Sequence, residues 1–347
     1  MANDLAAAQQ LAQWISGKWI SQAIYVAAEL SIADVLASGD KSVEQLAEAT
    51  HTHAPALHRL LRALASIGIF RECAPQRFES TPLGDLLRTG AMRAACIMAH
   101  SSWHDQAWAQ FLHSVRTGES AFEKAHATPL FDWLGSNPEA AGVFNEAMAA
   151  GKNYRDFGIA EHYEFERFER MVDVGGGHAS LAISILQKHP GLQAVIADLP
   201  QVTEGAKLAI QNAGLSARCR VVPCDFFEHV PAQGDLYVLA HVLHDWSDER
   251  CLQILANCRK AMPSHGKLLL VEALLLEGNQ PDRLKWLDLE MLVLTSGGRE
   301  RSEQEYRRLL AAAGFELTRT LVTGGSRSII EACVGGSQRE TPTRQEP

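Results

Sequence analysis

The sequence predicts an α/β fold in which a mostly parallel, seven-stranded sheet follows a helical region that ends in a winged-helix pattern. From about residue 166, short apolar runs alternate with helical ones, as in a parallel sheet covered on both faces. Before that point, amphipathic helical spacing leads into two short strands. The length of 347 residues allows two domains, at roughly 150 residues each.

The N-terminal elements come in the order helix, helix, hairpin. Residues 7–36 have helical spacing, and in "SVEQLAEAT" Ser42 followed by Glu44 and Gln45 predicts a capped short helix. Residues 53–70 predict a second amphipathic helix, and residues 70–84 predict two short strands around a proline-containing turn. One face of the second helix is expected to carry the apolar residues Leu57, Leu60, Leu61, Leu64 and Ile67.

The middle of the chain, residues 91–165, is expected to be helical. It carries six aromatic residues, of which most are expected in the core and a few in a pocket wall: Trp103, Trp108, Phe111, Phe131, Trp133 and Phe144.

Seven apolar runs predict the strands of the sheet, and the last two lie close enough together to form a terminal hairpin. The runs are "RMVDV", "LQAVIADL", "CRVVPC", "DLYVLAHV", "KLLLVEALLL", "FELTRTLV" and "SRSIIEACV". The C-terminal residues lack apolar side chains and are expected to be disordered. The expected regions are therefore 1–100 (winged-helix-like), 101–165 (helical linker), 166–336 (catalytic) and 337–347 (tail).

The composition of the chain limits the classes of partner and the cellular location that are expected. A net charge of −9 argues against nonspecific binding to nucleic acid or to anionic membranes. Asp4 stands where a signal peptide would carry a cation, and no run is apolar enough for a membrane span, so a cytoplasmic protein is expected. The seven cysteines form no Cys-x-x-Cys pair, and neither disulfides nor a metal site is expected.

A winged helix also raises the hypothesis of a DNA-binding regulator that senses a ligand. The second helix carries only Arg59 and Arg62 as firm positive charges, whereas a helix that reads a DNA groove normally lies in a basic patch. DNA binding is therefore the less favoured interpretation.

The stretch "MVDVGGGHAS" places three glycines directly after the first strand of the sheet. A loop at this position meets the ligand of a doubly wound fold, and its backbone N–H groups are free to bind it. Gly175 and Gly177 fit both a dinucleotide loop, whose third glycine would be at Ser180, and an S-adenosylmethionine loop, whose third glycine would be at Ala179. Asp173 precedes them, as the second kind of loop prefers.

The next two strand ends favour the methyl donor. Asp198 is placed to accept hydrogen bonds from two ribose hydroxyls, a feature that NAD enzymes share, and Leu199 follows it. Asp225 can accept from the adenine amino group, and Phe226 can cover the ring. Three carboxylates on successive strand ends suit a cationic sulfonium, whereas they would repel a pyrophosphate.

The reaction is read from "HVLHDWSDERC". His244 follows the fourth strand end, and the carboxylates of Glu272 and Glu300 arrive from later loops at the same edge. A phenol with a pKa of about 10 is a poor nucleophile, and a neutral histidine can take its proton as the methyl moves. We therefore expect His244 to be the base and the two glutamates to orient it.

Taken together, "VDVGGGHAS", "ADLP", "CDFF", "HVLHDWSDERC", "GGRERSEQEY" and "SIIEA" resemble the small-molecule O-methyltransferases of the plant caffeate/flavonoid and bacterial polyketide-tailoring type. The resemblance covers nearly the whole chain. It implies a Rossmann-like class I methyltransferase domain, S-adenosyl-L-methionine as cofactor, and a homodimer built on the N-terminal domain.

The resemblance also implies site residues. It makes His244 the base, flanked by Glu272 and Glu300. Its donor-binding residues are those matching Gly175, Asp198, Asp225 and Phe226, and Asp173, Gly177 and Leu199 are expected beside them from their places at the strand ends. Its acceptor neighbours are those matching Phe144, Met148, Asp245 and Met291, and Trp103 is expected with them as one of the aromatic residues of the middle region.

This sequence departs from the family pattern at two positions. Ala179 replaces the usual glycine, and Ala240 stands where plant members carry a lysine near the donor. The lysine contact is therefore expected to be absent or replaced by one from His241.

The expected function is methyl transfer to a hydroxyl of an aromatic small molecule, such as a natural-product phenol. Relatives of this fold also catalyse N-methylation, hydroxylation, decarboxylation or rearrangement, and these outcomes stay open.

Overall fold

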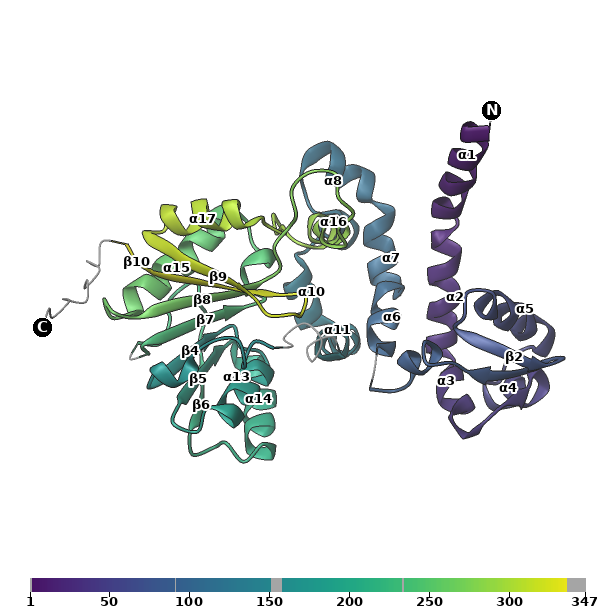
Figure 1. The fold of residues 1–347 in the computed structure, drawn as a ribbon, viewed down its shortest axis with the longest axis horizontal. Helices are drawn as coiled ribbons and strands as arrows, with labels where there is room; N and C mark the ends of the chain where they lie inside the picture. Colours follow the sequence, from purple (N-terminus) through teal and green to yellow (C-terminus); the bar gives the residue numbers. More distant parts are fainter. Residues whose placement is uncertain (1, 91, 151–157, 233, 336–347) are drawn as a thin grey trace, which may run out of the picture. The chain divides into compact units, whose positions relative to one another are not determined.

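The apolar runs of the second half pair into one seven-stranded sheet in the computed structural model, which describes residues 2–90, 92–150, 158–232 and 234–335. The strand order is β6-β5-β4-β7-β8-β10-β9 (Figure 1). The strands are β4 (Arg170–Val174), β5 (Gln193–Asp198), β6 (Cys219–Pro223), β7 (Leu236–Ala240), β8 (Lys267–Glu272), β9 (Phe315–Val322) and β10 (Ser328–Val334).

The pairing confirms the predicted topology. The first five strands of this sheet are parallel, with Val172 opposite both Val195 of β5 and Tyr237 of β7. Strand β10 is antiparallel to β8 and to β9, so the last two runs form the predicted terminal hairpin. The carboxyl ends of β4 to β8 therefore meet at one edge of the sheet.

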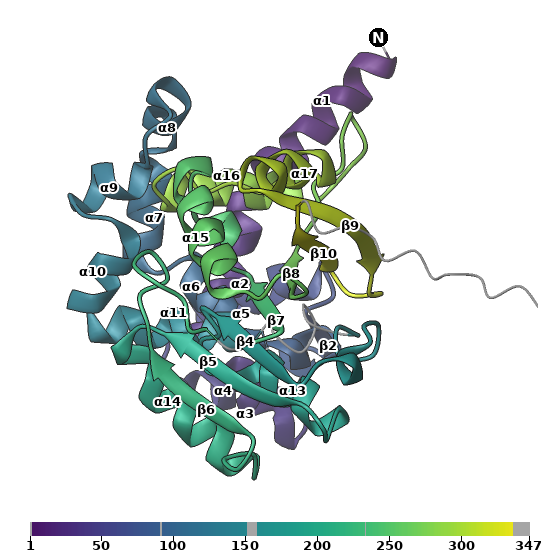
Figure 2. The ribbon, with the colours of Figure 1, turned by 90° about the vertical axis from the view of Figure 1, so that its left-hand side faces the viewer.

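Successive side chains of each strand point to opposite faces of the sheet, so both faces carry apolar side chains. Helices cover both faces (Figure 2). On one face Met171 and Ile196 pack against helices α13 and α14. On the other face Val172 and Val195 pack against α15 and α17. The helices of this part are α13 (Ser180–Lys188), α14 (Pro200–Asn212), α15 (Asp248–Ala261), α16 (Leu284–Leu294) and α17 (Glu303–Ala312), with 3-10 turns η3 (Phe165–Arg167) and η4 (Leu243–Asp245).

The chain separates into two units, which are described one at a time. The first consists of Met1–Ala109 and Phe131–Gly151, and the second consists of Gln110–Leu130 and Lys152–Pro347. The expected linker, residues 101–165, thus contributes to both units. The second unit also contains α8 (Phe111–Thr117) and α9 (Ala121–His126), which pack on α16.

The first unit holds the predicted helix, helix, hairpin order. Its three-stranded antiparallel sheet has the order β1-β3-β2. Its elements are α1 (Ala2–Ile15), α2 (Gly17–Glu29), α3 (Ile32–Val35), η1 (Leu36–Ser38), β1 (Lys41–Ser42), α4 (Val43–Ala49), α5 (Ala54–Ala65), β2 (Phe70–Ala74), β3 (Arg77–Ser80), η2 (Gly84–Leu87), α6 (Arg93–Ala99), α7 (Ser102–Ala109), α10 (Leu130–Ser136), whose first residue is assigned to the second unit, and α11 (Pro138–Ala150).

For the two predicted helices of this unit, the structure tests the start of the first and the end of the second. Helix α4 begins with a capping box, in which Ser42 and Gln45 exchange backbone and side-chain hydrogen bonds, as expected. The second helix ends earlier than expected, because α5 ends at Ala65 rather than near residue 70, and Ile67 lies beyond its end with 41% of its surface exposed. Ile69, beyond the turn, is buried in its place.

Two further expectations concern the ends and helices of the chain. The expected disordered tail falls almost wholly on residues 336–347, which lie outside the described residues. Among the helices that the structure describes, none alone is long and apolar enough to span a membrane, although the bent pair Leu5–Glu29 and Ile32–Ser38 passes on length and composition.

Candidate active site

The glycine loop lies at the carboxyl end of β4 and is tied to the neighbouring strand. The Gly177 N–H donates to Asp198 Oδ2 at 2.8 Å, and the Leu199 N–H donates to Asp198 Oδ1 at 2.7 Å. The carboxylate of Asp198 thus faces the glycine loop. Helix α13 begins at Ser180, directly after the loop.

Gly175 is required by the space around it. Its φ of +72° is in the left-handed region, and an added Cβ would lie 2.9 Å from Val242 Cγ2 and 3.4 Å from the Phe226 ring. Ala179 has a φ of +62°, so the chain adopts at this position the backbone that a glycine would adopt without strain.

Asp173 and Asp225 support the same edge. Asp173 is buried, and its carboxylate lies directly under Gly176. Asp225 follows β6, and its Oδ1 accepts from the Phe227 N–H at 2.8 Å. The backbone carbonyl of Phe226 is held by the side-chain amide of Asn257 at 2.9 Å.

His244 and Glu272 form a buried pair beside this edge. His244 Nδ1 lies 2.8 Å from Glu272 Oε2, and Glu272 Oε1 accepts from the Leu243 N–H at 2.9 Å. Because an ionised carboxylate only accepts, His244 donates its Nδ1–H, and Nε2 carries the lone pair whenever the ring is neutral. Asp245 Oδ1 lies 3.6 Å from that Nε2.

The pKa values of this pair move in opposite directions. Burial alone would lower the pKa of His244, but the carboxylates of Glu272 and Asp245 outweigh it and raise that pKa to about 9. Burial alone would raise the pKa of Glu272, but the imidazolium of His244 outweighs it and lowers that pKa to about 2. At neutral pH the pair is therefore an ion pair in the ligand-free protein.

Glu300 lies close enough to the pair to interact electrostatically with both members. Its side chain is buried, and its two carboxylate oxygens have no hydrogen-bond partner among the residues that the structure describes. Burial raises the pKa of this carboxyl above its usual value. The backbone N–H of Glu300 donates to Asp288 Oδ1 at 2.8 Å, which fixes the segment.

His241 lies next to the pair, after the end of β7. Its φ is +58°, and its Nδ1 accepts from Arg327 Nε at 3.1 Å. Arg327 is buried, and its positive charge acts on Glu272 and Glu300. No local pattern in the sequence indicates this role for Arg327, because the terminal hairpin that carries it is far from His241 along the chain.

The predicted acceptor neighbours divide between the two units. Asp245 and Met291 belong to the second unit, where Met291 of α16 is buried. Trp103, Phe144 and Met148 belong to the first unit, where Trp103 packs against Trp133 with ring centroids 5.9 Å apart and Phe144 packs edge-on against Phe131. Their role in holding an acceptor stays a prediction.

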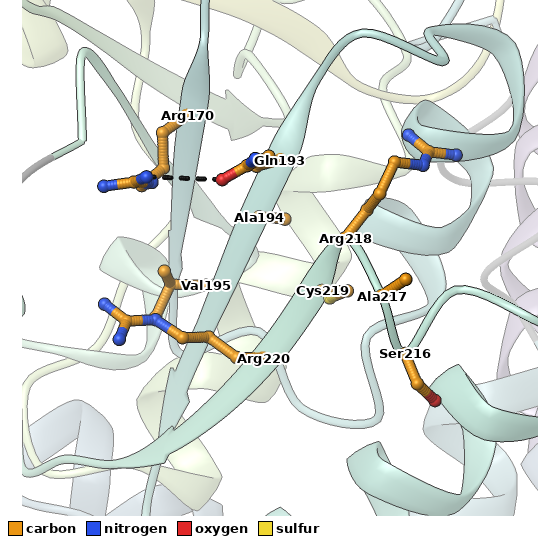
Figure 3. Close-up of a pocket in the computed structure, with 9 residues that line it drawn as sticks. All are labelled: Arg170, Gln193, Ala194, Val195, Ser216, Ala217, Arg218, Cys219 and Arg220. Atoms are coloured by element: carbon orange, nitrogen blue, oxygen red, sulfur yellow. Dashed lines mark hydrogen bonds between the residues drawn. The ribbon is translucent and has the colours of Figure 1, made fainter.

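A surface hollow of about 270 Å³ opens at the amino ends of the parallel strands, opposite the carboxyl ends that carry the glycine loop (Figure 3). It is lined by the amino ends of β4, β5 and β6, including Arg170, Gln193 and Arg220. The guanidinium of Arg218 is already bound to the backbone carbonyls of Leu186, His189 and Leu192. This hollow is therefore separate from the edge that carries His244.

Two family models match the chain. Residues 108–316 match an O-methyltransferase domain, and residues 12–90 match an O-methyltransferase dimerisation domain. A phenazine O-methyltransferase of Lysobacter antibioticus is 46% identical over 93% of this chain and 95% of that protein. An 8-amino-8-demethylriboflavin N,N-dimethyltransferase of Streptomyces davaonensis is 33% identical over 94% of this chain and 95% of that protein.

A solved structure adds ligands to the comparison. An O-methyltransferase from neocarzinostatin biosynthesis, in complex with S-adenosylmethionine and 2-hydroxy-5-methyl naphthoic acid, has a TM-score of 0.79 and 33% identity. The match covers 91% of this chain and 96% of that one.

Proposed function

The chain belongs to the S-adenosylmethionine-dependent O-methyltransferase family of natural-product tailoring, and from this premise we propose that it methylates a hydroxyl of an aromatic small molecule with His244 as general base. The observation that carries the proposal is the buried pair of His244 Nδ1 and Glu272 Oε2, 2.8 Å apart. This contact leaves Nε2 as the nitrogen that takes a proton from the acceptor.

Three features of the sheet edge support the placement of the donor. The backbone at Gly175 leaves a space that a Cβ would fill. Asp198 and Asp225 offer carboxylate oxygens to the hydroxyl and amino groups of an adenosine. Asp173 adds a negative charge beneath the loop, which suits a cation.

S-adenosylmethionine, when bound, supplies an electrophilic methyl group on a positively charged sulfur. The protein's part is to hold the acceptor oxygen in line with that methyl and to remove the proton. His244 takes the proton at Nε2, and Glu272 stabilises the imidazolium that results. Glu300 is proposed to act on His244, because its negative charge also favours the protonated imidazole.

N-methylation is the second candidate, because a relative at 33% identity is an N,N-dimethyltransferase. A neutral aromatic amine already carries its nucleophilic lone pair, so methyl transfer to it needs no base before the bond forms. An amine acceptor should therefore tolerate the loss of His244 far better than a phenol.

The experiment compares phenols and aromatic amines as acceptors of an isotopically labelled methyl group. We expect at least one phenol to be methylated and the rate to fall at least about a hundredfold in His244→Ala, the scale of a lost general base. His265→Ala, at an exposed position before β8, is the matched control. Transfer to amines alone, or an undiminished His244→Ala variant with phenols, would contradict the proposal.

We also propose a homodimer, on the basis of the dimerisation domain matched by residues 12–90. The cytoplasmic location expected from the sequence stays a prediction.

A further inference from the structure

We propose that Arg301 and Gly298 are positioning residues for His244, holding the turn that carries the base without touching the reactants themselves. Both belong to the segment 298–301, which packs against the turn 243–246 that contains η4. The inference rests on the proposed role of His244 as the base.

Arg301 binds the carbonyls on both sides of the base. Its guanidinium is 1% exposed, and it donates from Nη1 to Leu243 O at 2.8 Å and from Nη2 to Trp246 O at 2.9 Å. A second pair of contacts, from Nη2 and Nε to Asp248 Oδ1 at 2.7 and 3.0 Å, fixes the plane of the guanidinium. One rigid, planar group therefore sets the distance between the two ends of the turn.

Gly298 fits against the peptide of the base itself. An added Cβ would lie 2.7 Å from His244 O and 2.8 Å from the carbonyl carbon of Asp245, and it would overlap Thr295 Oγ1. The Arg299 N–H donates to the same His244 O at 2.8 Å. The backbone of Gly298 is not in the left-handed region, so only the lack of space excludes a larger residue here.

The same segment is joined to the strand that carries Glu272. Leu274, just beyond β8, forms a bridge with Arg301, and the Leu275 N–H donates to Arg301 O at 3.0 Å. The turn with His244 and the strand with Glu272 are therefore both anchored to Arg301. This arrangement fixes the 2.8 Å contact between Nδ1 and Oε2, on which the orientation of the imidazole depends.

Burial of the Arg301 charge also argues for more than packing. Among the residues that the structure describes, its carboxylate partner is Asp248, which is 54% exposed, so the ion pair is only half shielded from water, whereas the Arg301 side chain is 1% exposed. An apolar side chain would avoid this desolvation, but it would not donate to two carbonyls at once.

The test uses Arg301→Lys and Gly298→Ala in the full-length enzyme with a phenol that the wild type methylates. We expect kcat to fall about 10- to 100-fold, the effect of misplacing a reacting group by up to about 1 Å. The Kd for S-adenosylhomocysteine should stay within about twofold, because the donor loop and Asp198 lie in other segments. Controls are Arg307→Lys, in an exposed pair with Glu303, and Gly191→Ala, whose Cβ meets open space.

The pH profile separates positioning from a purely structural role. If the turn shifts, His244 loses contact with Glu272, and the acidic limb of kcat/KM should move toward lower pH while the charges of Asp245, Glu300, His241 and Arg327 are unchanged. The Tm is measured alongside. If Arg301→Lys does not fold, Gly298→Ala carries the test with a single added methyl group.

Three outcomes overturn the inference. The first is wild-type kcat and pH profile in both variants, and the second is a loss of donor binding in proportion to the loss of turnover. The third is an active His244→Ala enzyme, which removes the proposed function as well. The first outcome, when it is found beside an inactive His244→Ala enzyme, overturns the positioning roles of Arg301 and Gly298 and leaves the proposed function standing.

Discussion

His244 is protonated at neutral pH in the ligand-free protein, since its pKa is raised to about 9 by the neighbouring carboxylates. Only the neutral ring can act as base, and kcat/KM reports the ionisation of the free enzyme. We therefore predict that kcat/KM for the acceptor rises with pH through a midpoint near pH 9 and levels off only above about pH 10. The measurement is the initial rate at low acceptor concentration between pH 6 and about 10, with acceptors whose own pKa lies outside this range.

The control for this profile is Glu272→Gln, which keeps the shape of the side chain and removes its charge. Without that charge, burial dominates and the pKa of His244 should fall, so the rise in kcat/KM should move to lower pH. A profile with the same midpoint in wild type and Glu272→Gln would show that another group controls the rate.

The same pair makes folding stability depend on pH. The pKa of His244 is higher in the folded protein than the 6.5 of a free histidine, so its contribution is full below about pH 6.5 and is lost as the pH rises through about 9. The pKa of Glu272 is lowered to about 2, so its contribution is full above about pH 4.5 and is lost as the pH falls through 2. We predict that the Tm difference between wild type and His244→Gln is largest near pH 5.5 and shrinks by pH 10.

At the scale of elements, the loop between β4 and α13 is limited by the side chains around it. We predict that Gly175→Ala weakens S-adenosylmethionine binding at least tenfold and lowers the free energy of unfolding by about 1–3 kcal/mol, because the new methyl meets Val242 and φ is +72°. Isothermal titration and chemical denaturation measure the two effects.

A double variant separates the two causes. Val242 is buried, so Val242→Ala is measured alone as well, and Gly175→Ala should cost less stability in the Val242→Ala background than in the wild type because the steric overlap is removed there. Gly191→Ala, where an added Cβ meets no atom within 4 Å, should behave like the wild type. An equal loss from Gly175→Ala in both backgrounds would leave the contact with Val242 without a role.

The sequence predicts those elements whose signals are local. Alternating apolar runs predict every strand of the sheet, and Ser42 with Gln45 predicts the cap of α4, because period and capping depend on residues a few positions apart. The expected end of the second helix near residue 70 is wrong because a helix end depends on the packing of the turn beyond it.

The candidate site is predictable where it follows from topology. The carboxyl ends of parallel strands must meet at one edge, which brings His244 and Glu272 together although they are 28 residues apart. Arg301 and Gly298 lie in the stretch "GGRERSEQEY", but nothing in their spacing indicates that they contact the turn 243–246. Such contacts depend on how a loop folds back in three dimensions.

At the scale of the whole molecule, two successive helices of the first unit expose large apolar side chains. Leu11, Trp14, Ile15 and Trp19 are each between 56% and 74% exposed in the single chain, and three of them carry the aromatic or β-branched bulk that usually lies in an interface. Residues 12–90 match a dimerisation domain, so we assign this surface to the proposed homodimer.

We predict that light scattering gives the wild type a mass of twice the 38.0 kDa of one chain, and that Trp14→Ser combined with Trp19→Ser shifts it toward one chain. The reason is that each indole leaves water on association, and a serine in its place removes that gain. Trp286→Ser is the control, because this indole is 73% exposed but lies on α16 of the second unit.

The bent pair Leu5–Glu29 and Ile32–Ser38 has a length and composition that also fit a membrane, so the wild type is mixed with phosphatidylcholine vesicles in parallel. A monomer that floats with the vesicles would assign the exposed helices to lipid, whereas a dimer that stays in the aqueous fraction assigns them to a second copy of the chain.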